Sequence, residues 1–245
     1  MVYLRHLMLL CVFFFVPLSA DEDTVSNSFL DEQESLYISL GADCRAAHFS
    51  SLAGLKKASF PFDWILSLNT KSVSRLIRDN FEFFLDEGCF EKHPTYTHVM
   101  VNNYYGIEFR HEWNCNLWND FYKYKEDFGD IQIKYQRRID RFFRLADYKG
   151  KVFFIRAAFN PNMDSNIKDL PIEQRGTTYE EAVELRNALR EKFPKLDLTL
   201  VIANYIGDIE APFDIEGVIE FKFIKPAVSE DQDMINMFKQ LKEMD

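Results

Sequence analysis

Continuous apolar runs in the second half of the chain predict strands that are buried on both faces. Three such runs lie at 151–157, 198–203 and 218–224. Strands of a parallel sheet have this composition because helices cover both faces of the sheet. The segments between and after these runs, at 178–193 and 229–244, are predicted helices. This alternation of strands and helices predicts an α/β domain with a mostly parallel sheet flanked by helices.

Two features strengthen the helix predictions. Thr178 and Glu181 have the Thr-x-x-Glu spacing of a capping box, in which each side chain binds the backbone N–H of the other residue. A much longer helix is predicted at 119–148, because apolar residues recur there at three- and four-residue steps.

The first half of the predicted domain contains one strand, two helices and an extended segment. A β-rich run at 36–41 ends in glycine and leads through a tight turn into a helix at 45–57. A second helix is predicted at 70–80, and alternating apolar and polar residues predict extended structure within 96–113. The aromatic-rich middle, near residues 80–120, is expected to be an insertion or an edge of the domain.

The first 35 residues are expected to lie outside this domain. Residues 1–20 have the basic start, short apolar run and small-residue exit of a secretory signal peptide. The apolar run of about 12 residues is shorter than the roughly 20 that a spanning helix needs. Residues 21–35 are acidic and are predicted to form a disordered leader. We therefore predict a secreted or periplasmic protein, not stably inserted in a membrane after cleavage, with one domain at 36–245.

Composition and charge narrow the classes of function. The 245 residues are 47% hydrophobic and 28% charged, which excludes a disordered or low-complexity chain. The formal net charge is −10 at pH 7. Because a protein needs a positive potential to bind the phosphates of nucleic acid, nucleic acid is not expected as a partner. The sequence has no glycine-rich phosphate motif, and Cys89, His93 and His98 lack a fourth ligand at a zinc-type spacing. Neither a cofactor nor a metal is expected.

Cys44 occupies the position at which a nucleophile would be expected. It joins the predicted strand 36–41 to the following helix, at the edge where ligands bind in open α/β sheets. The N-terminus of a helix has positive potential and free N–H groups, which stabilise a thiolate and an oxyanion. The alternative is a buried, inert cysteine. Cys89 and Cys115 are close in sequence, and a disulfide between them would leave Cys44 free.

Two histidines are candidates for the base that such a nucleophile needs. His111, at the end of the extended segment, can approach the thiol from the side opposite the helix. His48 lies one helical turn after Cys44 and ranks second, because it would point along the helix. Asp63, in the Phe-Pro-Phe-Asp-Trp cluster at 60–64, is either an orienting carboxylate or a buried, hydrogen-bonded residue of a packed turn.

Several other side chains are candidates for binding a substrate. Trp64 can line a groove for a sugar or peptide, although core packing is the simpler interpretation. Arg137 and Arg141 are expected to share one face of the long helix with Arg144, either gripping an anionic group or forming a solvated face. The full set of candidates is Asp43, Trp64, Arg137, Arg141 and Arg156.

Four motifs occur in a fixed order along this chain. They are Ser-Leu-Gly-Ala-Asp-Cys at 39–44, Pro-Phe-Asp-Trp at 61–64, His-Glu-Trp at 111–113 and Arg-Arg-Ile-Asp-Arg-Phe at 137–142. Together with the strand Phe-Phe-Ile-Arg at 153–156, they resemble a bacterial domain-of-unknown-function family described as papain-like cysteine peptidases. The resemblance extends over most of the chain after residue 36.

This resemblance implies Cys44 as the nucleophile and His111 as the base of a cysteine peptidase. Glu112 and Trp113 stand where the family has Asp and Phe, which leaves His111 itself in place. Asp63 precedes His111 and would break the papain-like order of Cys, His, then Asn or Asp. Three residues that keep this order are open as the third member: Asp120, Asn160 and Asn204.

Two classes of function follow. The first is a cysteine-dependent hydrolase, a peptidase or amidase, in which the Cys44 thiolate attacks a carbonyl and His111 moves protons. N–H groups near residues 44–46 would hold the oxyanion. The second is a non-catalytic or transferase-like α/β domain that binds a sugar, nucleotide or peptide and grips an anionic group with an arginine. In both classes the expected partner is a peptide or a small molecule.

Overall fold

The computed structural model describes residues 30, 33–94, 96, 99–112, 121–158, 176–205, 213–223 and 230–244, without the side chains of 121–127 and 230–231. The predicted signal peptide at 1–20 and most of the predicted leader lie outside these ranges, so both stay predictions. Within the described ranges, no helix is both long and apolar enough to cross a membrane.

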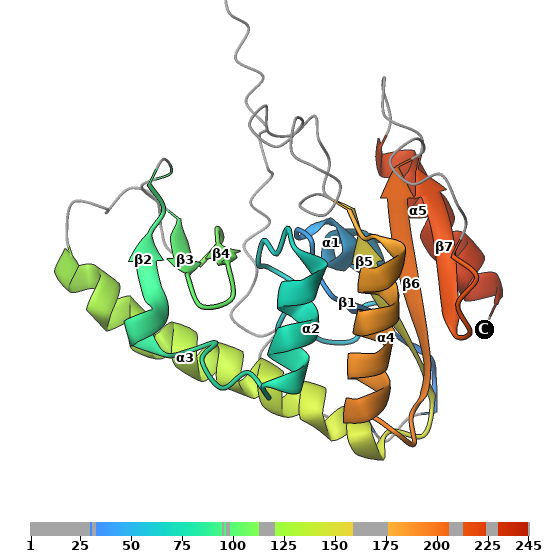
Figure 1. Ribbon diagram of the computed structural model, residues 1–245, viewed down its shortest axis with the longest axis horizontal. Coiled ribbons are helices and arrows are strands. Elements are labelled where there is room, and N and C mark those ends of the chain that lie inside the picture. Colours follow the sequence, from blue (N-terminus) through green and yellow to red (C-terminus); the bar gives the residue numbers. More distant parts are fainter. Residues whose placement is uncertain are drawn as a thin grey trace, which may run out of the picture.

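The larger of the two sheets in the described structure is parallel and has four strands (Figure 1). Its strands are in the order β1-β5-β6-β7, with every neighbouring pair parallel. The strands are β1 (Leu36–Ser39), β5 (Lys151–Ala157), β6 (Asp197–Tyr205) and β7 (Val218–Phe223). The predicted α/β domain with a mostly parallel sheet is thereby confirmed.

Helices cover both faces of this sheet. Alternate strand residues such as Phe154 and Leu200 enter one apolar core, whereas Phe153 and Val201 enter a second core on the opposite face. The first core contains residues of α2 (Thr70–Arg78), α3 (Phe121–Phe143) and α4 (Tyr179–Lys192). The second contains residues of α1 (Arg45–Leu52) and α5 (Glu230–Glu243). Burial on both faces explains why these strands are continuously apolar.

The aromatic-rich middle forms a second, antiparallel sheet in the order β2-β3-β4, preceded by the short 3-10 helix η2. These elements are η2 (Glu87–Cys89), β2 (Phe90–Lys92), β3 (Met100–Asn102) and β4 (Ile107–Phe109). Helix α3 runs from this small sheet to the parallel sheet (Figure 1), and the 3-10 helix η4 (Arg144–Asp147) extends it. Ring contacts mark both ends of α3, with Phe128 against Phe90 at 5.2 Å and Phe142 against Phe154 at 6.0 Å. The expected insertion is therefore packed into the same core as the parallel sheet.

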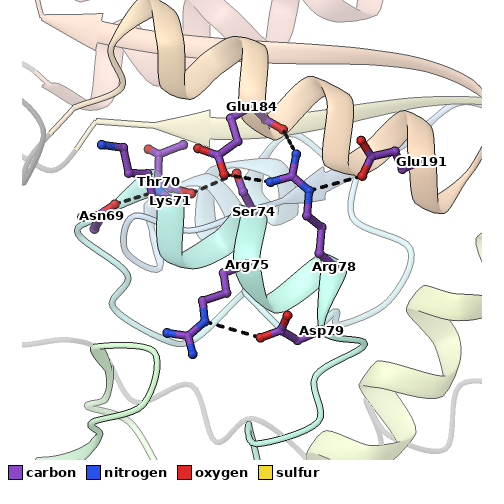
Figure 2. A network of polar contacts seen from close by, with 9 residues as sticks. All are labelled: Asn69, Thr70, Lys71, Ser74, Arg75, Arg78, Asp79, Glu184 and Glu191. Carbon is purple, nitrogen blue, oxygen red and sulfur yellow. Dashed lines mark hydrogen bonds and ion pairs between the residues drawn. The ribbon is translucent and has the colours of Figure 1, made fainter.

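Helices α2 and α4 lie side by side and share a network of polar contacts at their surface (Figure 2). The Arg78 guanidinium of α2 contacts two carboxylates of α4, those of Glu184 at 2.8 Å and Glu191 at 3.2 Å. Because these side chains are well exposed, the ion pairs contribute little free energy. The helix pair is stabilised mainly by the apolar side chains beneath this network.

The predicted capping box is present at the start of α4. The Thr178 hydroxyl accepts the Glu181 N–H at 3.3 Å, and the Glu181 carboxylate accepts the Thr178 N–H at 3.0 Å. We expect Thr178→Ala to lower the free energy of unfolding by about 1 kcal/mol, because an N–H at the helix start loses its acceptor. Urea denaturation followed by circular dichroism measures this change. Ser72→Ala in the first turn of α2 is the control and is expected to change stability by no more than a few tenths of a kcal/mol.

Candidate functional site

The turn between β1 and α1 brings Cys44 to the edge of the parallel sheet. Cys44 is the N-cap residue of α1, and its half-buried thiol makes no capping hydrogen bond. Gly41 has a φ of +81°, and a Cβ there would overlap the Ser67 hydroxyl and lie 3.0 Å from Arg156 Nη1. The predicted strand–turn–helix geometry is thus confirmed, with a helix that ends at Leu52 rather than Lys57.

Asp43 and Arg45 hold this turn in place. The Asp43 carboxylate accepts the Arg45 backbone N–H at 2.9 Å and Arg45 Nε at 2.8 Å. The Arg45 guanidinium also donates to the Tyr205 hydroxyl and to the Ala158 carbonyl, both at the carboxyl ends of strands. One N–H group that was expected to be free for an oxyanion, that of Arg45, is therefore already occupied.

The surroundings of Cys44 favour the neutral thiol. Burial and the adjacent Asp43 carboxylate raise the pKa of Cys44 to about 11, against the opposing effect of Arg45. The expected stabilisation of a resting thiolate by the helix N-terminus is therefore wrong for this arrangement. The physical reason is that burial destabilises the thiolate by more than the N-terminus of α1, a helix of only eight residues, stabilises it.

His111 follows β4, and its ring packs edge-on against Trp64 with 6.1 Å between the ring centroids. Partial desolvation lowers the pKa of His111, and Arg110 acts in the same direction, whereas Glu112 and Asp43 oppose the shift. The imidazole is therefore neutral at pH 7, which is the form that accepts a proton.

Asp43 is a common neighbour of the two predicted catalytic groups. Its charge raises the pKa of Cys44 and also that of His111, which places both groups within electrostatic reach of one carboxylate. In the described part of the chain, no hydrogen bond joins the thiol to the imidazole. His48, the second-ranked base, is exposed and packs against Phe49.

Asp63 lies in a packed turn beside this site. Its buried carboxylate accepts the Phe60 N–H at 3.1 Å and pairs with Lys56 Nζ at 3.4 Å. Burial raises the pKa of Asp63, against the opposing charges of Lys56 and Arg138. Both partners belong to the turn and its flank, which agrees with the structural interpretation of this residue.

Glu112 joins the site to helix α3, a role that the sequence reasoning missed. Its side chain is 2% exposed and binds Lys134, and it accepts the Tyr135 hydroxyl at 2.8 Å. Arg138 Nη1 lies 4.0 Å from the same carboxylate. A signal was present, because position 138 belongs to the apolar stripe of α3 that includes Ile131, Tyr135 and Phe142.

The arginines predicted to bind substrate have different environments. Arg137 is exposed, whereas Arg141 is buried and donates to the Ser59 carbonyl, so the expected shared face of these residues is wrong. All five N–H groups of buried Arg156 donate to acceptors of the surrounding chain, which are Leu40 O, Ser67 O, Ser67 Oγ, Leu68 O and Thr70 Oγ1. Arg156 therefore has no donor left for a ligand and instead fixes the loops around the site.

Asn204, Cys89 and the possible metal ligands have the following environments. The Asn204 side chain binds the Thr177 backbone, accepting its N–H at 3.0 Å and donating to its carbonyl at 2.9 Å. The other two candidates for the third member, Asp120 and Asn160, lie outside the described residues, as does Trp113. Cys89 is a free thiol, so the possible Cys89–Cys115 disulfide is not supported, and Cys115 itself lies outside the described residues. Within the described ranges, no three His, Cys, Asp or Glu residues are grouped so that they could hold a metal ion.

Comparison with known proteins gives a sequence relative and a family. The chain is 34% identical over 143 residues to "Uncharacterized protein R408" of Acanthamoeba polyphaga mimivirus, a match covering 53% of this chain and 64% of the viral protein. No solved structure matches significantly. The family model described as "Putative papain-like cysteine peptidase (DUF1796)" matches residues 35–207, which include Cys44, Asp63, His111 and Arg138. The chain therefore belongs to this family, as its motifs predicted.

Proposed function

We propose that the protein is a cysteine-dependent hydrolase, a peptidase or amidase, with Cys44 as nucleophile and His111 as base. The observation that carries this proposal is the shared neighbour Asp43, whose charge acts on both the thiol and the imidazole. The family description supports the same class of reaction. The missing hydrogen bond between the two groups is compatible with it, because catalytic contacts in free enzymes often tighten only when substrate binds.

The pKa directions define how the reaction would begin. Both groups are neutral at pH 7, so attack of Cys44 Sγ on the carbonyl carbon is coupled to transfer of the thiol proton to His111. The imidazolium then protonates the leaving amine as the C–N bond breaks, and a thioester remains. Neutral His111 next takes a proton from water, which attacks the thioester and releases the acid and the thiol. The nearby Asp43 carboxylate stabilises the imidazolium form in both steps.

Labelling with iodoacetamide between pH 6 and pH 10 tests this proposal. In the His111→Gln variant, the labelling rate of Cys44 is expected to rise about tenfold per pH unit, because the thiolate fraction rises in that way below a pKa of about 11. In the wild type, proton transfer to neutral His111 should hold the rate nearly constant around pH 7, about 100-fold above the variant. The two profiles should converge near pH 10.

The free thiol of Cys89 is an internal control in the same chain, read separately by mass spectrometry of the labelled peptides. Its labelling should not respond to His111→Gln. Identical profiles for Cys44 in the wild type and in His111→Gln would show that the imidazole does not serve this thiol, and the hydrolase proposal would fail.

A further inference from the structure

A group of five charged side chains lies where the loop before α2, the end of β4 and helix α3 meet. Asp63 pairs with Lys56 at 3.4 Å, and Glu112 binds Lys134 and lies 4.0 Å from Arg138 Nη1. Arg138 also acts on the charge of Asp63, which connects the two pairs. Among these five described side chains, the cations exceed the carboxylates by one.

Arg138 is the member of this group whose hydrogen bonds are incomplete. The residue is 5% exposed, and its Nε and Nη1 atoms have no hydrogen-bond acceptor among the described residues. A separation of 4.0 Å from Glu112 is too long for a hydrogen bond, and both oxygens of Glu112 already accept from Tyr135 and Lys134. Buried guanidinium N–H groups without acceptors cost free energy, so this position favours an external acceptor.

Trp64 supplies a second buried donor without a partner. Its Nε1 atom has no hydrogen-bond acceptor in the part of the chain that the structure describes. Lys56 Nζ lies 4.8 Å from the centre of the Trp64 ring, and the His111 ring packs against the same indole at 6.1 Å. Trp64 thus lies between the charged group and the proposed base.

We infer that Arg138 and Trp64 bind a carboxylate of the substrate beside the proposed catalytic pair. A guanidinium forms its strongest hydrogen bonds with carboxylates, and one bound carboxylate would neutralise the excess positive charge. The indole N–H would donate to the same ligand. The identity of the ligand as substrate rests on the proposed function, whereas the binding of a carboxylate does not.

Binding is tested on the full chain with sodium acetate as the probe, at constant ionic strength maintained with sodium chloride. The arginine Nε–H and tryptophan Nε1–H signals are followed by ¹⁵N–¹H NMR, with Arg138→Lys and Trp64→Phe used to assign them. The chemical shifts of both signals are expected to change with increasing acetate concentration until they reach a plateau. The signal of exposed Arg144 is not expected to change in this way. Because the wild-type spectrum carries the test, a variant that fails to fold does not prevent it.

Two outcomes of this titration would overturn the inference. The first is that neither assigned signal moves with acetate, or that both move only linearly and in step with Arg144. The second is that inorganic phosphate produces the saturable shift and acetate does not, since the ligand would then not be a carboxylate. The Cys44→Ala variant is expected to keep the acetate response, so a failure of the hydrolase proposal is recognised separately.

Matched peptides then identify the source of the carboxylate. One pair differs by Glu against Gln, and the other by a free against an amidated C-terminus. In one of the two pairs, the peptide with the carboxylate is expected to be cleaved at least about tenfold faster than the peptide with the amide. The reason is that a neutral amide cannot form the charge-assisted hydrogen bond that a carboxylate forms with the guanidinium. This preference, measured as the ratio of cleavage rates within the pair, should shrink in Arg138→Lys. Equal cleavage within both pairs would overturn the assignment of the carboxylate to the substrate.

Discussion

Replacing Arg156 with methionine is expected to lower the free energy of unfolding by about 3–5 kcal/mol. Burial lowers the pKa of Arg156 to about 10, so the guanidinium is still charged at pH 7. It donates to Leu40, Ser67, Leu68 and Thr70, which come from the end of β1, the loop before α2 and the start of α2. Methionine fills a similar volume but leaves these buried acceptors without donors, which is the costly case for a buried polar group.

Urea denaturation and thermal unfolding followed by circular dichroism measure this effect. For a domain of this size, the loss corresponds to a fall in melting temperature of roughly 10 °C. Arg137→Met is the matched control, because Arg137 is exposed on α3 and its replacement is expected to change stability by no more than about 0.5 kcal/mol. A change below about 1 kcal/mol for Arg156→Met would show that water or rearranged side chains satisfy the same acceptors.

The fold was predictable from local patterns because its strands are covered on both faces. Strand β5 has the predicted bounds, and the capping box fixes the start of α4 at the predicted residue. The small antiparallel sheet was less well defined, since strands of three residues leave little pattern to detect. Its packing through α3 into the main core depends on ring contacts between segments far apart in sequence.

The candidate site was predictable in position but not in electrostatics. The strand–turn–helix pattern placed Cys44 correctly, because a glycine before a helix start is a local signal. The raised pKa of Cys44 depends on burial and on the neighbouring charge, and the sequence does not show how far burial outweighs a helix terminus. The arginines differ in this respect, since the apolar stripe of α3 includes position 138 and not position 137, which is a local signal for their burial.

Together, these environments distinguish residues that shape the site from those that would react in it. Arg45 and Arg156 hold the β1–α1 turn and the adjoining loop through hydrogen bonds to buried acceptors. The Cys44 thiol and the His111 ring make no such bonds in the described structure, which leaves them available to a ligand. Variants of the first pair should therefore change stability, and variants of the second pair should change activity at nearly constant stability.

Replacing Cys44 with alanine is accordingly expected to reduce hydrolysis of peptides or amides by about 10³–10⁴-fold, because the variant lacks the thiol that is proposed to form the thioester. The assay follows cleavage in a mixture of peptides of diverse sequence by mass spectrometry. Cys89→Ala is the matched control and should keep wild-type activity, since Cys89 is a free thiol in η2 and is not part of the proposed site. Retained cleavage in Cys44→Ala would exclude this nucleophile. A wild type that cleaves no peptide or amide, yet binds acetate at Arg138, would instead identify the site as a carboxylate-binding domain without this chemistry.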